Sequence, residues 1–593
     1  MEQESCRAQN DGYRRTLTSR FANPPNRRYA QNIAIPPTYK YRPLRNPKGY
    51  IRLLYLFPQS CSAGLQERSV LPCVILTYQI SKAPPYTGLS YTWGDTTLCR
   101  KIDVGGRLLH ITENLAVALE YLQEEKRTLV LWVDAVCINQ TDELEKGAQV
   151  QMMGKIFMHA SVVIAWLGPP KDGSDEIMQW RKRNLRSMRQ SPPPLFNLGP
   201  SEGKRHISEA VTAFLERPWF NRVWVMQEVA LNNNVVFVCG KKDSDKITLL
   251  HYISFAAAVL NCITYQYISV HATRFETRKP SSLKIYLTRL QNIDSLSSHI
   301  DLHSSEPKDF VYSYLGMISD SEKYQLRADY TKTVEDVYTD FTVAIIRAGK
   351  LRSVAGLIRP SLRYPKLPSW VPDWSVTRKY SRGFDRYKIP SSKAEVWLTN
   401  KGDRLIRISA LRIDSIESVE CIHLINDHST STLSENLCKF LVKLRTTLSR
   451  YSVADDKEIN QIISNMSVEV SGAQWNKSTS IVKELYDSYL AACGISETII
   501  DPETSQAEKS RRDLLPLEGT EIQHIFVTRR RNVGLTCSSA LPGDFLAALG
   551  DLGRLWILRE VNPGRYRIIS SASMAFHPYE IEMSRQAEVI EIL

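Results

Sequence analysis

The feature of this sequence that most limits its fold is an alternation of short apolar runs and amphipathic helical patterns between about residues 50 and 245. Apolar runs bounded by Gly or Pro predict β-strands, and apolar residues that recur every three to four positions predict helices. Strands that alternate with helices are typical of an α/β domain with a mainly parallel sheet. We predict strands at 51–57, 71–78, 129–136, 161–167 and 235–239, a hairpin at 101–111, and helices at 114–126, from the cap Asp142 to about 160, at 206–216 and at 218–231.

The length and the charge distribution suggest several parts. A chain of 593 residues is long enough for three or four domains of roughly 100–200 residues each. Residues 1–50 hold ten basic and three acidic side chains, which is +7 of the net charge of +13. We therefore predict a disordered basic tail at 1–45, the α/β domain at 46–245, a mainly helical extension at 246–375, and a mixed α/β C-terminal region at 376–593 with a β-rich end at 521–593.

The composition excludes several classes of protein. With 43% hydrophobic and 23% charged residues, the chain is neither wholly disordered nor collagen-like nor a multi-span membrane protein. The uncharged stretch 247–273 exceeds the about 20 residues that cross a bilayer, but Asn261, Gln266 and two His interrupt it, so we expect no membrane span. The eleven Cys include no CxxC pair, so we expect reduced thiols in the cytoplasm and no metal site.

Four short motifs follow one another in the predicted α/β domain. They are GLSYTWGD at 88–95, LWVDAVCINQ at 131–140, AWLG at 165–168 and RPWFNRVWVMQEV at 217–229. In this order and spacing they strongly resemble the fungal heterokaryon incompatibility (HET) domain, over about residues 86–229. Downstream, DFVY at 309–312, DY at 329–330 and LPSWVPDW at 367–374 resemble the long extension that such fungal proteins often carry.

The resemblance implies a function. HET domains are viewed as effectors of non-self recognition and programmed cell death in fungi, and they are thought to resemble the flavodoxin-like Toll/interleukin-receptor (TIR) fold. Because some TIR domains cleave NAD, NAD is a candidate substrate, with no cofactor implied; NAD glycohydrolase activity rests on this analogy alone. The implied partners are an unidentified incompatibility protein and a second copy of the chain, with no nucleic acid expected. The alternative is a non-catalytic signalling or self-association scaffold.

Polar residues follow the predicted strands and are candidates for a binding site. Asp134 ends an apolar strand, Asn139 and Gln140 follow in the next loop, and Asp95 lies just past another strand. In a parallel sheet, ligands bind beyond the carboxyl ends of the strands, so we expect Asp95, Asp134 and Gln140 at one rim. The alternative is that Asp134 and Asn139 satisfy the amides of turns and helix caps.

Glu228 is the first candidate for a catalytic residue, with Asp134 second. Glu228 lies four residues after Trp224 on the same face of a predicted helix. A buried Trp224 would desolvate this carboxylate and raise its pKa, which suits acid–base chemistry or contact with sugar hydroxyls. The alternative is a structural ion pair with Arg217 or Arg222.

Overall fold

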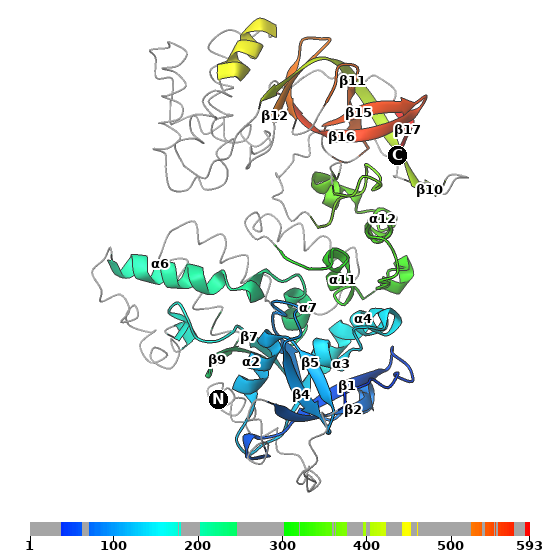
Figure 1. Ribbon diagram of the computed structural model, residues 1–593. Helices are drawn as coiled ribbons and strands as arrows, with labels where there is room; N and C mark the ends of the chain where they lie inside the picture. The colour runs from blue at the N-terminus through cyan, green and yellow to red at the C-terminus, as the bar shows by residue number, and fades with distance from the viewer. Residues whose placement is uncertain are drawn as a thin grey trace, which may run out of the picture. The chain divides into compact units, whose positions relative to one another are not determined.

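The computed structural model describes residues 37–61, 70–175, 177–178, 202–245, 249, 302–319, 321–358, 361, 363–375, 395–398, 404–422, 442–451, 459, 523–536, 540–550, 552, 555–574 and 587–593. The chain divides into two compact units, one of residues 1–282 with 299–333 and one of residues 283–298 with 334–593 (Figure 1). The predictions for residues 1–36 and, apart from residue 249, for the stretch 247–273 lie outside the described residues.

The described strands of the first unit form one nine-stranded sheet in the order β5-β4-β2-β1-β6-β3-β7-β8-β9. Four of its eight strand pairs are parallel, so the sheet is mixed, whereas the sequence predicts a mainly parallel one. The turns β4–β5 and β8–β9 are too short for the crossover that a parallel pair needs. The strands are β1 (Tyr50–Leu56), β2 (Leu71–Gln79), β3 (Thr87–Ser90), β4 (Arg100–Val104), β5 (Leu108–Ile111), β6 (Leu129–Trp132), β7 (Val162–Trp166), β8 (Val235–Cys239) and β9 (Lys242–Asp245).

Strands β6, β3, β7 and β8 are adjacent and mutually parallel. Their central residues are apolar and buried, as expected for strands covered on both faces. Because they are parallel, their carboxyl ends meet at the same edge of the sheet. This edge is where the motif residues of the candidate site lie.

The helices of the first unit connect and cover these strands. Asp142 caps α4 as predicted, because its Oδ1 accepts hydrogen bonds from the backbone N–H groups of Leu144 and Glu145 at 3.1 and 3.0 Å. The described helices are α2 (Glu113–Leu122), α3 (Asp134–Cys137), α4 (Glu143–His159), α6 (Glu202–Leu215), α7 (Val225–Ala230) and α11 (Asp309–Leu315), with short 3-10 turns η1 (Gln59–Cys61), η2 (Ile80–Lys82), η4 (Pro218–Asn221) and η5 (Ser321–Tyr324).

Two predicted elements are shorter than the sequence suggests. The strand predicted at 129–136 ends at Trp132, and the following residues form the single turn of α3. The helix predicted at 218–231 is divided into η4 and α7, because Arg222 adopts an extended conformation. The backbone beside Arg222 pairs with His303, whose N–H donates to the carbonyl of Asn221 at 2.7 Å. A contact with a distant segment therefore outweighs the local helical pattern.

A buried ion pair joins the sheet to α4. The Arg52 guanidinium on β1 donates to both carboxylate oxygens of Glu145, at 2.6 and 2.9 Å, and each side chain is only 2% exposed. Arg52 also donates to the carbonyl of Cys137, and Glu145 accepts from the N–H of Asn139 at 2.8 Å. The pair therefore fixes both ends of the loop between α3 and α4.

Part of the segment predicted as a tail packs on the first unit. Within residues 37–45, Thr38 forms a parallel bridge with Leu108 at the edge strand β5. The Tyr41 hydroxyl donates to the carbonyl of Val136 at 2.9 Å. The described portion of this segment therefore supports α3.

The described residues between 302 and 333, which belong to the first unit, also pack closely on the α/β domain. A Cβ atom added to Gly154 on α4 would lie 2.9 Å from the Cα of Gly316, just after α11. One added to Gly147 would lie 2.8 Å from the carbonyl oxygen of Ala328. Only glycine allows these backbones to approach so closely.

The second unit contains α12 (Val334–Arg347), η6 (Leu351–Leu357) and an antiparallel, β-rich C-terminal sheet, in agreement with the strand-like end of the sequence. Strands β11-β12-β13-β16-β15-β14 form a closed ring, because β14 also pairs with β11. Leu411, Phe526, Leu546 and Ile557 belong to its apolar core. The strands are β10 (Glu395–Leu398), β11 (Arg404–Ile422), β12 (Gln523–Thr528), β13 (Val533–Thr536), β14 (Phe545–Leu549), β15 (Leu555–Asn562), β16 (Arg565–Met574) and β17 (Glu588–Ile592). None of the described helices has both the length and the apolar character needed to cross a membrane.

The buried pair yields a stability prediction. Glu145→Leu should destabilise the first unit by about 3–5 kcal/mol, because it leaves the Arg52 charge buried without its partner. The double variant Arg52→Met with Glu145→Leu should recover much of this loss. The measurement is urea unfolding of the full chain. Glu120→Leu serves as a control, because Glu120 pairs with Arg100 at the surface and its loss should cost less than about 1 kcal/mol.

Candidate functional site

The pairing of two parallel strands brings Ser90 and Asp134 to the same level. Gly88 on β3 lies opposite Trp132 on β6. Ser90 and Asp134 each follow two residues later, at the carboxyl ends of their strands. Asp134 begins α3, and its Oδ1 accepts a hydrogen bond from the N–H of Ala135 at 2.8 Å. The carboxylate is thus held at the edge where ligands bind in open α/β sheets.

Glu228 reaches the same edge from α7. Its Oε2 accepts hydrogen bonds from the Ser90 hydroxyl and from Nη1 of Arg222, the latter at 3.1 Å. Glu228 is only 2% exposed and Ser90 is fully buried, whereas 13% of the Arg222 side chain is exposed. We call Ser90, Asp134, Arg222 and Glu228 the strand-end cluster. It has a buried floor at Ser90 and Glu228 and a more exposed rim at Arg222 and Asp134.

The electrostatics of the cluster are those of two carboxylates near one guanidinium. Burial raises the pKa of Glu228, and the negative charge of Asp134 adds to this effect, while Arg222 and Ser90 act against it. Burial likewise raises the pKa of Asp134 against the opposing effect of Arg222. In both groups burial is the largest influence. With all three groups ionised, the cluster carries a formal charge of −1 and favours a positively charged centre.

Aromatic side chains fix the cluster from two sides. The indole N–H of Trp219 donates to the Ser90 hydroxyl at 2.9 Å, and that of Trp93 donates to Oδ2 of Asp134 at 2.8 Å. Burial raises the pKa of the Tyr91 hydroxyl, and the nearby charge of Asp134 contributes to this shift. Trp219 is a core residue, whereas Trp93 is only half-buried and belongs to the rim.

The other predicted binding residues have local roles in the structure. Asp95 is exposed, and its Oδ1 accepts hydrogen bonds from the N–H and hydroxyl of Thr97 at 2.9 and 2.8 Å, which lower its pKa. Asn139 accepts from the hydroxyl of Thr141 in a similar turn. The Gln140 amide donates to the backbone carbonyl of Asp134 at 3.0 Å. The structure therefore brings Asp134 and Glu228 together and places Gln140 as a support for the Asp134 backbone.

The structure also separates the two arginines considered as partners of Glu228. Arg222 forms the ion pair, whereas Nη1 of Arg217 donates to the carbonyls of Leu167 and Pro169 at 2.7 and 3.1 Å. From the sequence, Arg222 is expected only as a structural partner of Glu228, and Ser90 is not among the predicted site residues. Both lie inside the motifs, but only the fold shows that they meet.

Neither Cys137 nor a metal-binding group offers a reactive centre in the part of the first unit that the structure describes. Cys137 is fully buried, and this burial raises the pKa of its thiol to about 12. A thiol with this pKa is not a ready nucleophile near neutral pH. The described part of the chain holds no group of three or more His, Cys, Asp or Glu residues that could bind a metal ion.

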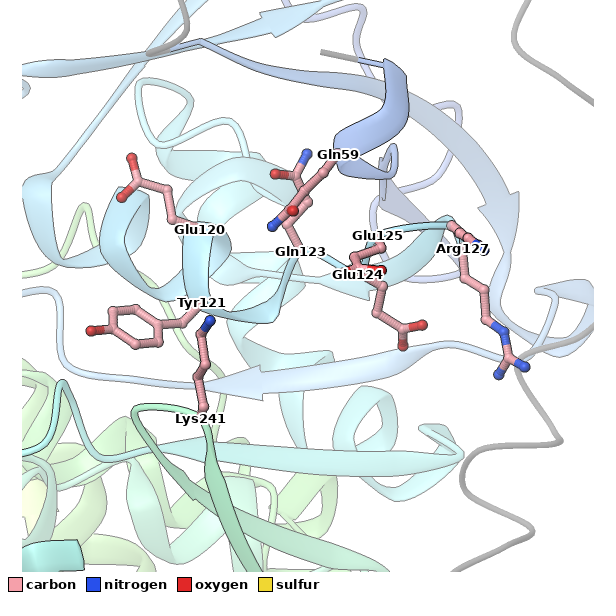
Figure 2. Close-up of a pocket in the computed structure, with 9 residues that line it drawn as sticks. Gln59, Glu120, Tyr121, Gln123, Glu124, Glu125, Arg127 and Lys241 are labelled. Carbon is pink, nitrogen blue, oxygen red and sulfur yellow. The ribbon is translucent and has the colours of Figure 1, made fainter. Parts of the chain in front are cut away.

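An open depression of about 660 Å³ lies elsewhere on the first unit (Figure 2). None of the cluster residues lines it. Its lining mixes acidic and basic side chains around Tyr121, whose ring packs against Trp166 at a centroid distance of 5.2 Å. The lining residues are Gln59, Glu120, Tyr121, Gln123, Glu124, Glu125, Lys126, Arg127 and Lys241. This mixed, open surface does not specify a ligand, so we place the candidate site at the strand-end cluster.

Comparisons with known proteins agree with the motifs. Residues 86–228 match the family model of the heterokaryon incompatibility protein (HET), so this segment is a HET domain. The chain is distantly homologous to Heterokaryon incompatibility protein 6, OR allele, of Neurospora crassa, with 28% identity over 414 residues. The alignment covers 57% of this chain and 60% of that relative, which is less than two thirds of either. No solved structure matches the chain at a significant level.

The raised pKa of Glu228 predicts a pH-dependent stability. The folded protein retains a proton on Glu228 that the unfolded chain releases near pH 4.5, the ordinary pKa of this group. The contribution of Glu228 to stability is therefore greatest below pH 4.5 and is lost as the pH rises through its folded pKa. Glu228→Gln should become progressively more stable relative to the wild type over this range, in urea unfolding at several pH values.

The matched control for this measurement is Glu143→Gln. Glu143 lies at the surface, at the start of α4, and its replacement also removes one negative charge. An equal pH trend in both variants would mean that the effect comes from the change in net charge and not from the burial of Glu228.

Proposed function

We propose that this HET domain protein acts in fungal heterokaryon incompatibility and programmed cell death, and that the strand-end cluster is its functional site. The single observation that carries the proposal is that the largely buried Arg222–Glu228 ion pair lies at the strand-end edge near Asp134, whose negative charge raises the pKa of Glu228. All the cluster residues lie within the segment that matches the HET model. The name of the Neurospora relative supports the biological role, since that protein is a heterokaryon incompatibility protein.

The order of the parallel strands supports a TIR-like or flavodoxin-like reading of the domain. The four adjacent parallel strands are, in chain order, β3, β6, β7 and β8, and across the sheet they lie in the order 2-1-3-4. Strands β2 and β4 form a separate parallel pair. The order 2-1-3-4 is the beginning of the flavodoxin-like order 2-1-3-4-5. In such sheets the ligand binds at the carboxyl end of the first strand, where the order reverses. Ser90 ends that strand, so the cluster is at the expected place for a nucleotide.

The chemistry that we propose for the cluster is hydrolysis of NAD. The bond between the ribose and the nicotinamide breaks, the nicotinamide leaves with the bonding electrons, and the positive charge moves onto the ribose as in glycoside hydrolysis. Water then forms the new C–O bond and releases a proton to a carboxylate or to solvent. A partly desolvated cluster with a net charge of −1 would stabilise the developing positive charge.

The structure suggests different roles for the two carboxylates. Asp134 retains exposed surface at the rim and is the group that could contact the ribose. Glu228 is 2% exposed and forms hydrogen bonds with Ser90 and Arg222. It would therefore act without touching the substrate, by fixing the geometry of the cluster and contributing to its negative charge. This ranks Asp134 first for contact with substrate, whereas the sequence alone ranks Glu228 first.

The burial of Glu228 favours a second candidate function. A carboxylate that is buried and hydrogen-bonded on both sides is also what a structural anchor requires. In that case the HET domain is a non-catalytic scaffold that acts by self-association or by binding an incompatibility partner. The two candidates differ in one measurable property, the release of nicotinamide.

The test is incubation of the purified full chain with NAD while nicotinamide release and thermal unfolding are both followed. Asp134→Asn should lower turnover by roughly a hundredfold or more, because it removes a preorganised charge from the transition state. Glu228→Gln should also lower turnover. Glu143→Gln, the surface control, should keep wild-type turnover.

Two outcomes would contradict the enzymatic proposal. One is equal turnover in the wild type and in folded Asp134→Asn and Glu228→Gln, which would place the activity elsewhere. The other is no turnover at high protein concentration, which would favour the scaffold. Induced expression of the full chain in a fungal host, scored for growth arrest beside Asp134→Asn, would then show whether the biological role depends on the cluster.

A further inference from the structure

The segment that carries Glu228 is held in place by residues from well beyond the HET match. The match ends at residue 228, yet the first unit continues to residue 333. The motifs DFVY at 309–312 and DY at 329–330 lie in this continuation. Residues of this continuation contact the 217–231 segment in three places.

The first contact is made by a buried carboxylate. Oδ2 of Asp309 accepts a hydrogen bond from the indole N–H of Trp224 at 3.0 Å and from the hydroxyl of Ser304 at 3.0 Å. Its Oδ1 accepts from the hydroxyl of Tyr330 at 2.7 Å. Burial raises the pKa of Asp309, while these three donors act against the shift. Trp224 immediately precedes α7, and its carbonyl accepts the backbone N–H of Glu228 at 3.1 Å.

The second contact is made by Gln227, the residue before Glu228. In the amide orientation that satisfies its surroundings, its nitrogen donates to the carbonyl of Ser313 on α11 at 3.0 Å. Its oxygen accepts from the N–H of Gly154 on α4 at 2.6 Å. Gln227 is fully buried, and a Cβ on Gly316 would collide with its side chain. The glycine therefore makes room for an amide that joins three helices.

The third contact is between backbones. The N–H of Val223 donates to the carbonyl of His303 at 3.4 Å, and the N–H of His303 donates to the carbonyl of Asn221 at 2.7 Å. These bonds flank Arg222 and keep it in the extended conformation that divides η4 from α7. His303 thus holds the backbone at Arg222, and Asp309 holds Trp224 at the start of α7.

We infer that residues 302–319 and 321–333 are a positioning element of the candidate site and that Asp309 is its central positioning residue, holding Trp224 so that Glu228 meets Ser90 and Arg222. The inference deepens the proposed function and rests on it for its biological meaning. The geometric part does not depend on catalysis. Asp309 touches neither the cluster carboxylates nor any group assigned to substrate contact, so it acts through Trp224.

The experiment measures hydrogen–deuterium exchange of the full chain in peptides that cover residues 217–231. Asp309→Ala should speed exchange in these peptides about tenfold, since it removes the acceptor shared by Trp224, Tyr330 and Ser304. Asp309→Asn should remain close to the wild type, because its amide oxygen can still accept the indole N–H. Trp224→Phe, which removes that N–H and keeps an aromatic ring, should resemble Asp309→Ala.

A matched control comes from the second unit. Asp373 is buried to a similar degree, and its Oδ2 accepts a hydrogen bond from the hydroxyl of Ser361 at 2.7 Å. Asp373→Ala should leave exchange in 217–231 unchanged. If Asp309→Ala fails to fold, the comparison of Asp309→Asn with Trp224→Phe still decides the question.

The inference fails if Trp224→Phe and Asp309→Ala leave exchange in 217–231 at the wild-type rate, or if exchange rises equally across the whole first unit. Nicotinamide release, measured on the same samples, separates this result from the proposed function. Faster local exchange in a chain without turnover supports the positioning element and rejects the enzyme. Normal local exchange with normal turnover supports the enzyme and rejects the positioning role of Asp309.

Discussion

A carboxylate that is taken out of water must find a cation or several hydrogen-bond donors, and this requirement organises the first unit. Glu145 pairs with Arg52, and Glu228 pairs with Arg222 and accepts a hydrogen bond from Ser90. Asp309 accepts hydrogen bonds from the indole of Trp224 and from the hydroxyls of Ser304 and Tyr330. Each of these three sets of contacts joins segments that are far apart in the sequence. Removing one partner leaves a buried group unsatisfied, which costs more than the pair contributes.

The three carboxylates are arranged around one edge of the sheet. The Arg52–Glu145 pair fixes the loop that follows Asp134, and Asp309 fixes the start of α7, which carries Glu228. The Arg52–Glu145 pair and Asp309, from different parts of the chain, therefore stabilise the edge of the sheet that holds Ser90 and Asp134. Asp134 and Glu228 are thereby held in place before any ligand binds. Such a pair of carboxylates suits either the stabilisation of a positive charge or a rigid interaction surface, and nicotinamide release distinguishes these two functions.

The limits of the family match and the limits of the folded unit do not coincide. The HET match ends at residue 228, one residue after Gln227, whose amide forms hydrogen bonds with α4 and α11. The glycines that allow this contact, Gly154 and Gly316, belong to segments before and after the last motif. A chain cut at the end of the motifs would therefore leave buried polar groups of α7 without their partners.

The sequence by itself determined the elements with a strong local signal and the identity of the domain. Apolar runs gave β1, β7 and β8 almost to the residue, Asp142 marked the start of α4, and four motifs in order identified the HET domain. The sequence also marks Asp134 and Glu228 as candidate site residues, since a polar residue after an apolar run and a carboxylate near a tryptophan can be recognised from the sequence alone. What these signals share is that they depend on neighbours within a few residues.

Only the tertiary structure decided the rest. The mixed pairing of the sheet and the break at Arg222 depend on which distant segments meet, and the local sequence pattern does not determine that. Arg217 and Arg222 have the same chemistry and nearly the same position in the sequence, yet one caps carbonyls and the other pairs with Glu228. Their roles differ because a buried charge is satisfied by whatever the fold places within hydrogen-bond distance, and that distance exists only in three dimensions.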